Sequence, residues 1–202
     1  MTDIDRIERV SGEDQSDDPV LVAAIREVRD GNTDAFETVM ARSERRIASL
    51  AWRILGDADE VRDAVQETFL RVYRFIHRYD DSRSALPWLF RITVNVCRDL
   101  ERGRRKRAER FIELEQNHQA PPENQPDAVA HRNEEIELLT RAIDELPRKE
   151  RLAIILRDIE GLPTEEVARI LGSRPATVRV QVSSARSKIR SFLSDRRRGV
   201  ES

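Results

Sequence analysis

The chain has 202 residues, of which 37% are charged and 39% apolar, and it contains only seven glycines. This mixture favours amphipathic helices over sheets, and the length allows one or two small domains with hydrophobic cores, so we expect an all-α fold. The net charge of −2 excludes attraction of nucleic acid by an overall basic field, and any DNA binding must come from local basic patches or with a partner's help.

Residues 1–17 are acidic and are interpreted as a disordered, solubilising tail; masking of basic patches in the free protein is the alternative. Two helices are predicted next. The first begins at Pro19 and ends at Gly31-Asn32, and the second runs over residues 34–55 and ends at Gly56.

A third helix is predicted over residues 59–76. Its buried stripe consists of Val61, Val65, Phe69, Val72 and Ile76. Leu70 lies on the opposite, polar face. An apolar residue in that position indicates either contact with another protein or the single exposed leucine that many surfaces carry.

The loop of residues 77–87 leads into a helix predicted from Trp88 to about Arg102. Its buried set is Leu89, Ile92, Val96 and Leu100. The opposite face carries a stripe of cations around one amide, extended past Gly103 by a basic cluster: Arg91, Asn95, Arg98, Arg102, Arg104, Arg105, Lys106 and Arg107. A solvated face would normally interleave acids, and Asp99 and Glu101 lie off the stripe, so the pattern favours a track for nucleic-acid phosphates with one base-reading side chain.

Residues 109–133 are rich in proline and amide side chains and are predicted to be a flexible linker, about 80 Å long at full extension. A second domain is predicted over residues 134–195, and a basic tail over residues 196–202. Its first helix, with Ile136, Leu139, Ile143 and Leu146, ends at Pro147, and its second runs from Glu150 to Ile159.

Residues 162–190 form the most informative stretch, which reads as two helices joined by a tight turn. Thr164 offers a hydroxyl to cap the first helix, Gly172 ends it, and Pro175 opens the second. The second helix has a buried stripe of Val178, Val182, Ala185 and Ile189. Its polar, cationic outer face fits a DNA major groove, although an ordinary helical hairpin with a solvated face has the same spacing.

Nothing in the chain indicates catalysis. There is no glycine-rich phosphate loop and no Ser/His/Asp arrangement, and the three histidines are scattered. The single cysteine, Cys97, is predicted to be a small core residue in a protein of a reducing compartment. No signal peptide is found, and the longest apolar run is too short for a bilayer. We therefore predict a cytoplasmic protein that is not an enzyme, with no catalytic residue, metal, cofactor, small-molecule substrate or membrane insertion.

Three ordered motifs resemble those of bacterial RNA polymerase sigma factors of the extracytoplasmic-function (ECF, group IV) type. They are DAVQETFLRVYR at 63–74, PWLFRITVNVCRDLERGRRKR at 87–107 and DELPRKERLAIILRDIEGLPTEEVARILG at 144–172. The resemblance implies sigma region 2 at residues 18–108 and a helix–turn–helix sigma region 4 at residues 134–195. It also implies core RNA polymerase and promoter DNA as partners, and an anti-sigma factor as a regulator.

The resemblance assigns three sets of site residues. The set that docks on core polymerase is Asp63, Gln66, Glu67, Leu70 and Arg71. The set that binds the −10 element is Trp88, Arg91, Asn95, Arg98, Arg102, Arg104 and Arg105. The set that binds the −35 element is Arg174, Thr177, Arg179, Val180, Gln181, Ser183, Ser184 and Arg186.

The −35 set departs from the family's usual pattern, in which arginines stand at the positions of Gln181 and Ser184 and a serine at that of Val180. Fewer cations predict fewer phosphate contacts, and Val180 could meet a thymine methyl group. We therefore expect a −35 preference unlike the family's common AAC-centred one.

Other classes of protein explain less of the chain. A free-standing helix–turn–helix regulator leaves the helix with Leu70 and the cationic stripe without a purpose, and it would bind duplex DNA tightly by itself. A helical adaptor that mimics a sigma factor would leave the stripe dispensable. A helical hydrolase lacks any acid/base or metal constellation.

Overall fold

The computed structural model describes residues 18–114 and 134–200, and of residues 108–114, 134–136 and 197–200 it gives only the backbone. The described ranges are helical and contain no strand, which confirms the all-α prediction. The predicted acidic tail, residues 115–133 of the predicted linker and the last residues of the basic tail lie outside the described residues.

Three helices open the fold: α2 (Pro19–Arg29), α3 (Ala35–Leu55) and α4 (Ala58–Phe75). The Asp18 carboxylate caps α2 by accepting hydrogen bonds from the amides of Val20 and Leu21, and Asp57 caps α4 in the same way. Gly56 ends α3 with a φ of +70°, a conformation that costs a residue with a side chain considerably more than it costs glycine.

A 3₁₀ turn, η1 (Ile76–Arg78), and a short loop lead into α5 (Ala85–Leu114). This helix begins three residues before the predicted start at Trp88, because a proline at position 87 is tolerated in a first turn. It also continues past Arg102 and past the expected domain boundary at residue 108, since the sequence there is rich in glutamate, arginine and leucine, which favour helix.

The C-terminal half contains α6 (Glu134–Asp144), α7 (Arg148–Ile154), the π-helical turn η2 (Ile155–Ile159), α8 (Thr164–Leu171) and α9 (Pro175–Val200). Gly172, with a φ of +64°, ends α8, and Pro175 opens α9, both as predicted. The predicted hydroxyl cap of α8 is wrong. Pro163 occupies the N-cap position and Thr164 is already the first helical residue, so no side chain caps this helix.

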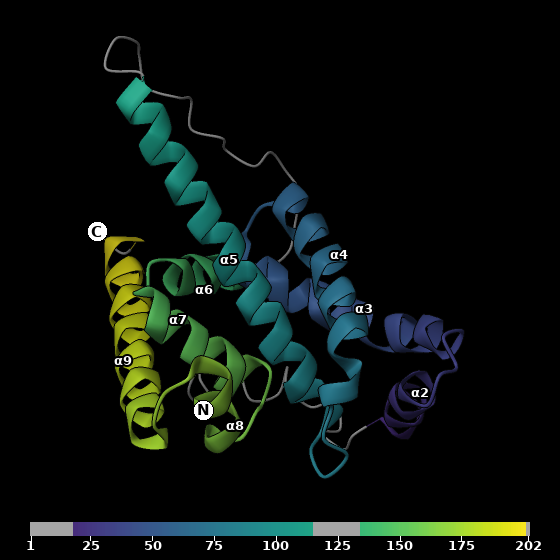
Figure 1. The fold of residues 1–202 in the computed structure, drawn as a ribbon. Coiled ribbons are helices and arrows are strands. Elements are labelled where there is room, and N and C mark those ends of the chain that lie inside the picture. The colour runs from purple at the N-terminus through teal and green to yellow at the C-terminus, as the bar shows by residue number, and fades with distance from the viewer. Residues whose placement is uncertain (1–17, 115–133, 201–202) are drawn as a thin grey trace.

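Helix α5 lies between the N-terminal helices and α6–α9, and its far end projects beyond them (Figure 1). Its predicted buried set is incomplete, because Ile92 and Leu100 are only partly buried while Phe90 and Val94 are fully buried. The reason is that α5 packs on two sides, against α3 and α4 and also against α8. Cys97 is buried as predicted, and desolvation raises the pKa of its thiol to about 12.

Candidate nucleic-acid interface

The outer face of α4 presents an apolar residue among polar ones. Leu70 is 66% exposed, beside the exposed Asp63 and Gln66 and the half-buried Glu67. Tyr73, one turn further on, is 48% exposed and packs edge-on against Phe36 with 5.1 Å between ring centroids. Tyr73 was missed by the sequence reasoning, although its i+3 spacing from Leu70 places both on one face. The face therefore offers a small apolar spot with a polar surround.

Arg71, predicted to belong to this docking face, also joins two helices. Its Nε donates to Glu67 Oε1 at 2.7 Å, and its Nη1 donates to Asp99 Oδ2 on α5 at 2.8 Å. The hydrogen bond to Asp99, together with that to Glu67, raises the pKa of Arg71 against the effect of desolvation. Arg71 thus positions α4 against α5 as well as contributing charge to the surface.

The predicted stripe on α5 is accessible. Arg91, Arg102 and Arg105 are exposed, and Trp88, Asn95 and Arg98 are half-buried. Arg104 forms an ion pair with Glu60 at 3.3 Å. Among the side chains that the structure describes, none forms an ion pair with Arg91, Arg98 or Arg102. These three guanidinium groups are therefore available for phosphate oxygens.

The loop before α5 is braced from two sides. Tyr79 is buried, lies 5.3 Å from the ring of Trp88, and donates from its hydroxyl to the Arg83 carbonyl at 2.7 Å. The Asp81 carboxylate pairs with Arg29 of α2 at 3.0 Å and with Arg26 at 3.4 Å. The hydrogen bond from Arg29 lowers the pKa of Asp81, so this carboxylate keeps its charge to a lower pH than an ordinary aspartate. The contact of Arg29 with Asp81 was not predicted, because the two residues are about 50 positions apart and neither segment carries a sequence signal for the pairing.

Helix α9 presents a mixed outer face. Val180 is 69% exposed, and Arg174, Thr177, Arg179 and Ser183 are exposed around it. Arg179 lies 3.8 Å from Glu165 of α8, an exposed pair that solvent screens strongly. Five of the eight predicted −35 residues therefore share one accessible surface.

The other three predicted −35 residues lie closer to the scaffold. Ser184 Oγ donates to Glu150 of α7 at 3.2 Å, and the half-buried Gln181 has a buried Oε1 without a partner among the described residues. Arg186 donates from Nε and Nη2 to the two carboxylate oxygens of Asp158, each at 2.7 Å. Ser184 is thus half-buried, and its hydroxyl faces α7 and not the open face of α9. Arg186 holds α9 on η2.

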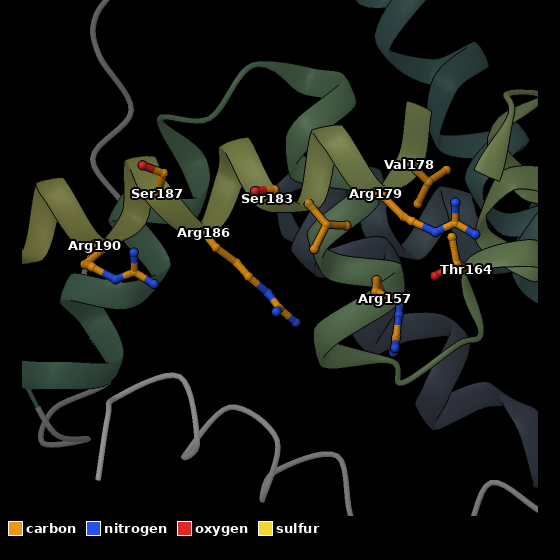
Figure 2. Close-up of a pocket in the computed structure, with 9 residues that line it drawn as sticks. Arg157, Thr164, Val178, Arg179, Ser183, Arg186, Ser187 and Arg190 are labelled. Atoms are coloured by element: carbon orange, nitrogen blue, oxygen red, sulfur yellow. The ribbon is translucent and has the colours of Figure 1, made fainter. Parts of the chain in front are cut away.

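A cationic hollow of about 510 Å³ opens beside α9. Figure 2 shows Arg157 of η2 and Thr164 of α8 on the border of the hollow. The side chain of Arg186 extends from α9 toward the side on which Arg157 lies. Its polar lining is Arg157, Thr164, Arg179, Ser183, Arg186, Ser187 and Arg190. Sequence reasoning missed Arg157, since the helix that carries it was assigned only to the core. Arg186 is paired with Asp158, so the guanidinium groups of Arg157, Arg179 and Arg190 are the ones that favour an anionic ligand such as a phosphate.

Other kinds of site are not found in the described parts of the chain. No group of three or more His, Cys, Asp or Glu side chains among residues 18–107 and 137–196 could hold a metal ion. No described helix is long and apolar enough to cross a membrane.

Two family models match the two halves of this fold. Sigma-70 region 2 matches residues 39–107, and Sigma-70, region 4 matches residues 136–189. The chain is 33% identical over 161 residues to the ECF RNA polymerase sigma factor SigE of Mycolicibacterium smegmatis, covering 79% of this chain and 62% of that relative. It is 32% identical over 183 residues to the ECF RNA polymerase sigma-E factor of Escherichia coli K12, covering 87% of this chain and 94% of that relative.

The chain belongs to the ECF RNA polymerase sigma factors. As such it is a transcription initiation factor without enzymatic activity, and regions 2 and 4 are its promoter-binding parts. The alternative of a free-standing helix–turn–helix regulator is not favoured, because region 2 accounts for the N-terminal helices that this alternative left unexplained.

Two solved structures share the fold. CnrH in complex with the cytosolic domain of CnrY has a TM-score of 0.63 and 24% identity, covering 87% of this chain and 98% of that one. The sigma factor RpoE of Bartonella quintana in complex with the anti-sigma factor NepR has a TM-score of 0.63 and 22% identity, covering 79% of this chain and 96% of that one.

Proposed function

We propose that this sigma factor docks on core RNA polymerase through the outer face of α4, opens and holds the −10 element with α5, and reads the −35 element with the outer face of α9. On α4, Leu70 is the apolar anchor and Asp63, Gln66 and Glu67 form its polar rim. Arg71 keeps that face in a fixed relation to the DNA-binding helix through Asp99.

The observation that carries the proposal is the stripe of Arg91, Arg98 and Arg102, which lacks ion-pair partners within the described part of the chain. In a protein whose net charge is −2, three cations in helical register favour a polyanion as their ligand, because the nearby Asp99 and Glu101 pair with other arginines. Asn95 lies in the same stripe and can pair with a base, while Trp88 beside Tyr79 offers an aromatic surface on which an unpaired base can stack.

On α9, Arg174, Thr177, Arg179 and Ser183 are the candidate contacts around Val180, and Arg157 adds a phosphate contact from across the hollow. Arg186 and Ser184 support the reading helix from behind, and Gln181 lies at its margin. We further infer that an anti-sigma factor regulates this chain, because its fold matches that of a sigma factor solved in complex with an anti-sigma factor. We also infer that the chain acts in the cytoplasm, as its membership of the sigma factors implies.

The test is run-off transcription with core polymerase and a library of promoters. Asn95→Ala should slow promoter opening, and Arg179→Ala should weaken −35 binding about tenfold by removing one base or phosphate contact. Lys149→Ala, an exposed cation of α7 outside the three sets, is the matched control and should leave initiation unchanged. Absence of initiation with any core polymerase, together with tight duplex binding by the protein alone, would support the free-standing regulator instead.

A second measurement addresses which −35 sequence is read. Because Val180 is 69% exposed at the centre of the α9 face, its methyl groups can pack on a thymine methyl. We expect selection of randomised promoters by the holoenzyme to return a −35 core that differs from AAC. Recovery of an ordinary AAC core would contradict this expectation, and Val180→Ser should move the selected core toward AAC.

A further inference from the structure

Helix α2 lies before residue 39, at which the match to Sigma-70 region 2 begins, and none of the three sets of site residues includes it. One face of α2 is nonetheless buried. Ile25 and Val28 of this face belong to the same apolar cluster as Tyr79, the first residue of the loop between η1 and α5. We call residues 79–84 the η1–α5 loop. The shared cluster therefore joins α2 to the η1–α5 loop.

The last turn of α2 also holds this loop by charge. Asp81 Oδ2 lies 3.0 Å from Arg29 Nη2, and Asp81 Oδ1 lies 3.4 Å from Arg26 Nε, so each carboxylate oxygen meets a different arginine. The side chains of Arg29 and Asp81 are 30% and 36% exposed, so solvent screens the pair and its contribution to stability is small. Two contacts to one carboxylate still restrict where Asp81 can lie. Their main effect is therefore on the position of the loop.

Hydrogen bonds within the loop fix its shape around Asp81. The Asp80 carboxylate accepts from the amide of Ser82 at 3.0 Å and from its hydroxyl at 2.7 Å, and it lies 3.2 Å from Arg83 Nε. The Arg83 amide donates to the Asp80 carbonyl at 2.9 Å, which closes a β-turn with Asp81 as its second residue. A displacement of Asp81 therefore moves the whole turn.

Tyr79 links this turn to α5. Its hydroxyl donates to the Arg83 carbonyl at 2.7 Å, and its ring lies 5.3 Å from that of Trp88. Trp88 offers the aromatic surface on which an unpaired −10 base can stack. The turn and Trp88 thus share one buried neighbour, so the ion pairs of α2 influence the place at which the base is held.

We propose that Arg29 and Arg26 of α2 are positioning residues for promoter opening, because by holding Asp81 they fix the η1–α5 loop in the conformation that receives the unpaired −10 base. This inference rests on the proposed function. A loop that is ordered before DNA arrives loses less conformational freedom when it captures the base, so capture is less costly. An ordered loop also offers one shape, so bases that do not fit it are captured less well.

The test follows promoter opening by holoenzyme on a promoter recovered from the library. 2-Aminopurine placed in the −10 element reports unstacking by a rise in fluorescence. Arg29→Ala should slow this rise about threefold and Asp81→Ala about fivefold, as expected for partly exposed ion pairs. R26A/R29A and R29A/D81A should each be about as slow as Asp81→Ala, because they remove the same contacts. Arg29→Lys keeps the charge and should open the promoter at nearly the parent rate.

Two matched controls remove similar charges away from the loop. Asp30→Ala removes the other carboxylate near Arg29, which lies 3.7 Å from it. Arg42→Ala breaks an ion pair of 3.7 Å between α3 and Asp18, at the opposite end of α2. Both variants should open the promoter at the parent rate. All variants should melt within about 4 °C of the parent chain, and if Arg29→Ala melts lower, Asp81→Ala, which leaves α2 unchanged, is the deciding variant.

Three further readouts separate positioning from loss of structure. Core affinity and −35 affinity should be unchanged in Arg29→Ala, because these activities are assigned to α4 and α9. When each base is tested in turn at the unpaired position, Arg29→Ala should discriminate between bases less than the parent chain does. Parent-like opening by both Arg29→Ala and Asp81→Ala, or a loss of core affinity as large as the loss of opening rate, would overturn the positioning role. If no chain initiates, the parent included, the proposed function fails and this inference fails with it.

Discussion

Replacing Leu70 by glutamate should weaken binding of core RNA polymerase about 30-fold, the loss typical of a central apolar anchor. Leu70 is 66% exposed and belongs to none of the buried clusters, so the substitution leaves the packing of the free protein intact. In the complex, however, a carboxylate would have to lose its water without a partner, which is costly in an apolar contact. Fluorescence anisotropy of labelled sigma factor titrated with core polymerase measures the change.

Val180→Glu is the matched control for Leu70→Glu. It also places a carboxylate at an exposed apolar position, but on the −35 face of α9. We expect Val180→Glu to retain core affinity and to lose −35 recognition, and Leu70→Glu to lose both activities because the factor no longer reaches the promoter with core. Equal core affinity for Leu70→Glu and the parent chain would remove α4 from the docking site.

Arg186→Ala should destabilise region 4 by about 3 kcal/mol, at the lower end of the range for breaking a buried ion pair. The side chain of Asp158 is only 5% exposed, and removal of the guanidinium leaves its two oxygens without their bidentate donor. For a chain of this size a loss of that magnitude lowers the melting temperature by about 10 °C, which calorimetry or circular dichroism can detect.

Arg190→Ala separates the structural role of Arg186 from a role in DNA binding. Arg190 lines the same cationic hollow and is exposed, and its replacement by alanine removes the same charge. We expect Arg190→Ala to melt with the parent chain and Arg186→Ala to melt well below it. Coincident melting curves for all three proteins would show that the contact with Asp158 does not hold α9 in place.

The local structure of region 4 could be predicted because each signal there is short-range. The stripe of Val178, Val182, Ala185 and Ile189 is buried, Gly172 adopts the left-handed conformation at the turn, and Val180 is exposed. Periodicity and turn chemistry depend on neighbours within a few residues, so one sequence suffices to find them. Leu70 was found in the same way, as an apolar residue out of phase with the buried stripe of its helix.

The long-range contacts could not be predicted, for a physical reason. Glu101 and Glu160 lie in charged segments and have the sequence character of surface residues, yet both are buried because each meets arginines from the other region. Likewise, the contact of Arg186 with Asp158 spans 28 residues and a change of helix type, so helical periodicity gives no sign of it. Such pairings depend on how folded helices pack against one another, and the residue spacing within one helix does not determine that packing.

The π-helical turn η2 sets the angular phase between the DNA-reading helices and the rest of the molecule. The Glu160 amide donates a hydrogen bond to the Ile155 carbonyl, five residues earlier and not four as in an α-helix. The turn therefore contains one residue more than an α-helical turn. Deleting one residue to restore a regular α-helix would rotate α8 and α9 relative to α7 by about 100°. Asp158 and Glu160, which now face α9 and α3, would no longer face both partners at once. The turn therefore links two contacts. One holds α9 on η2 through Asp158, and the other joins region 4 to region 2 through Glu160.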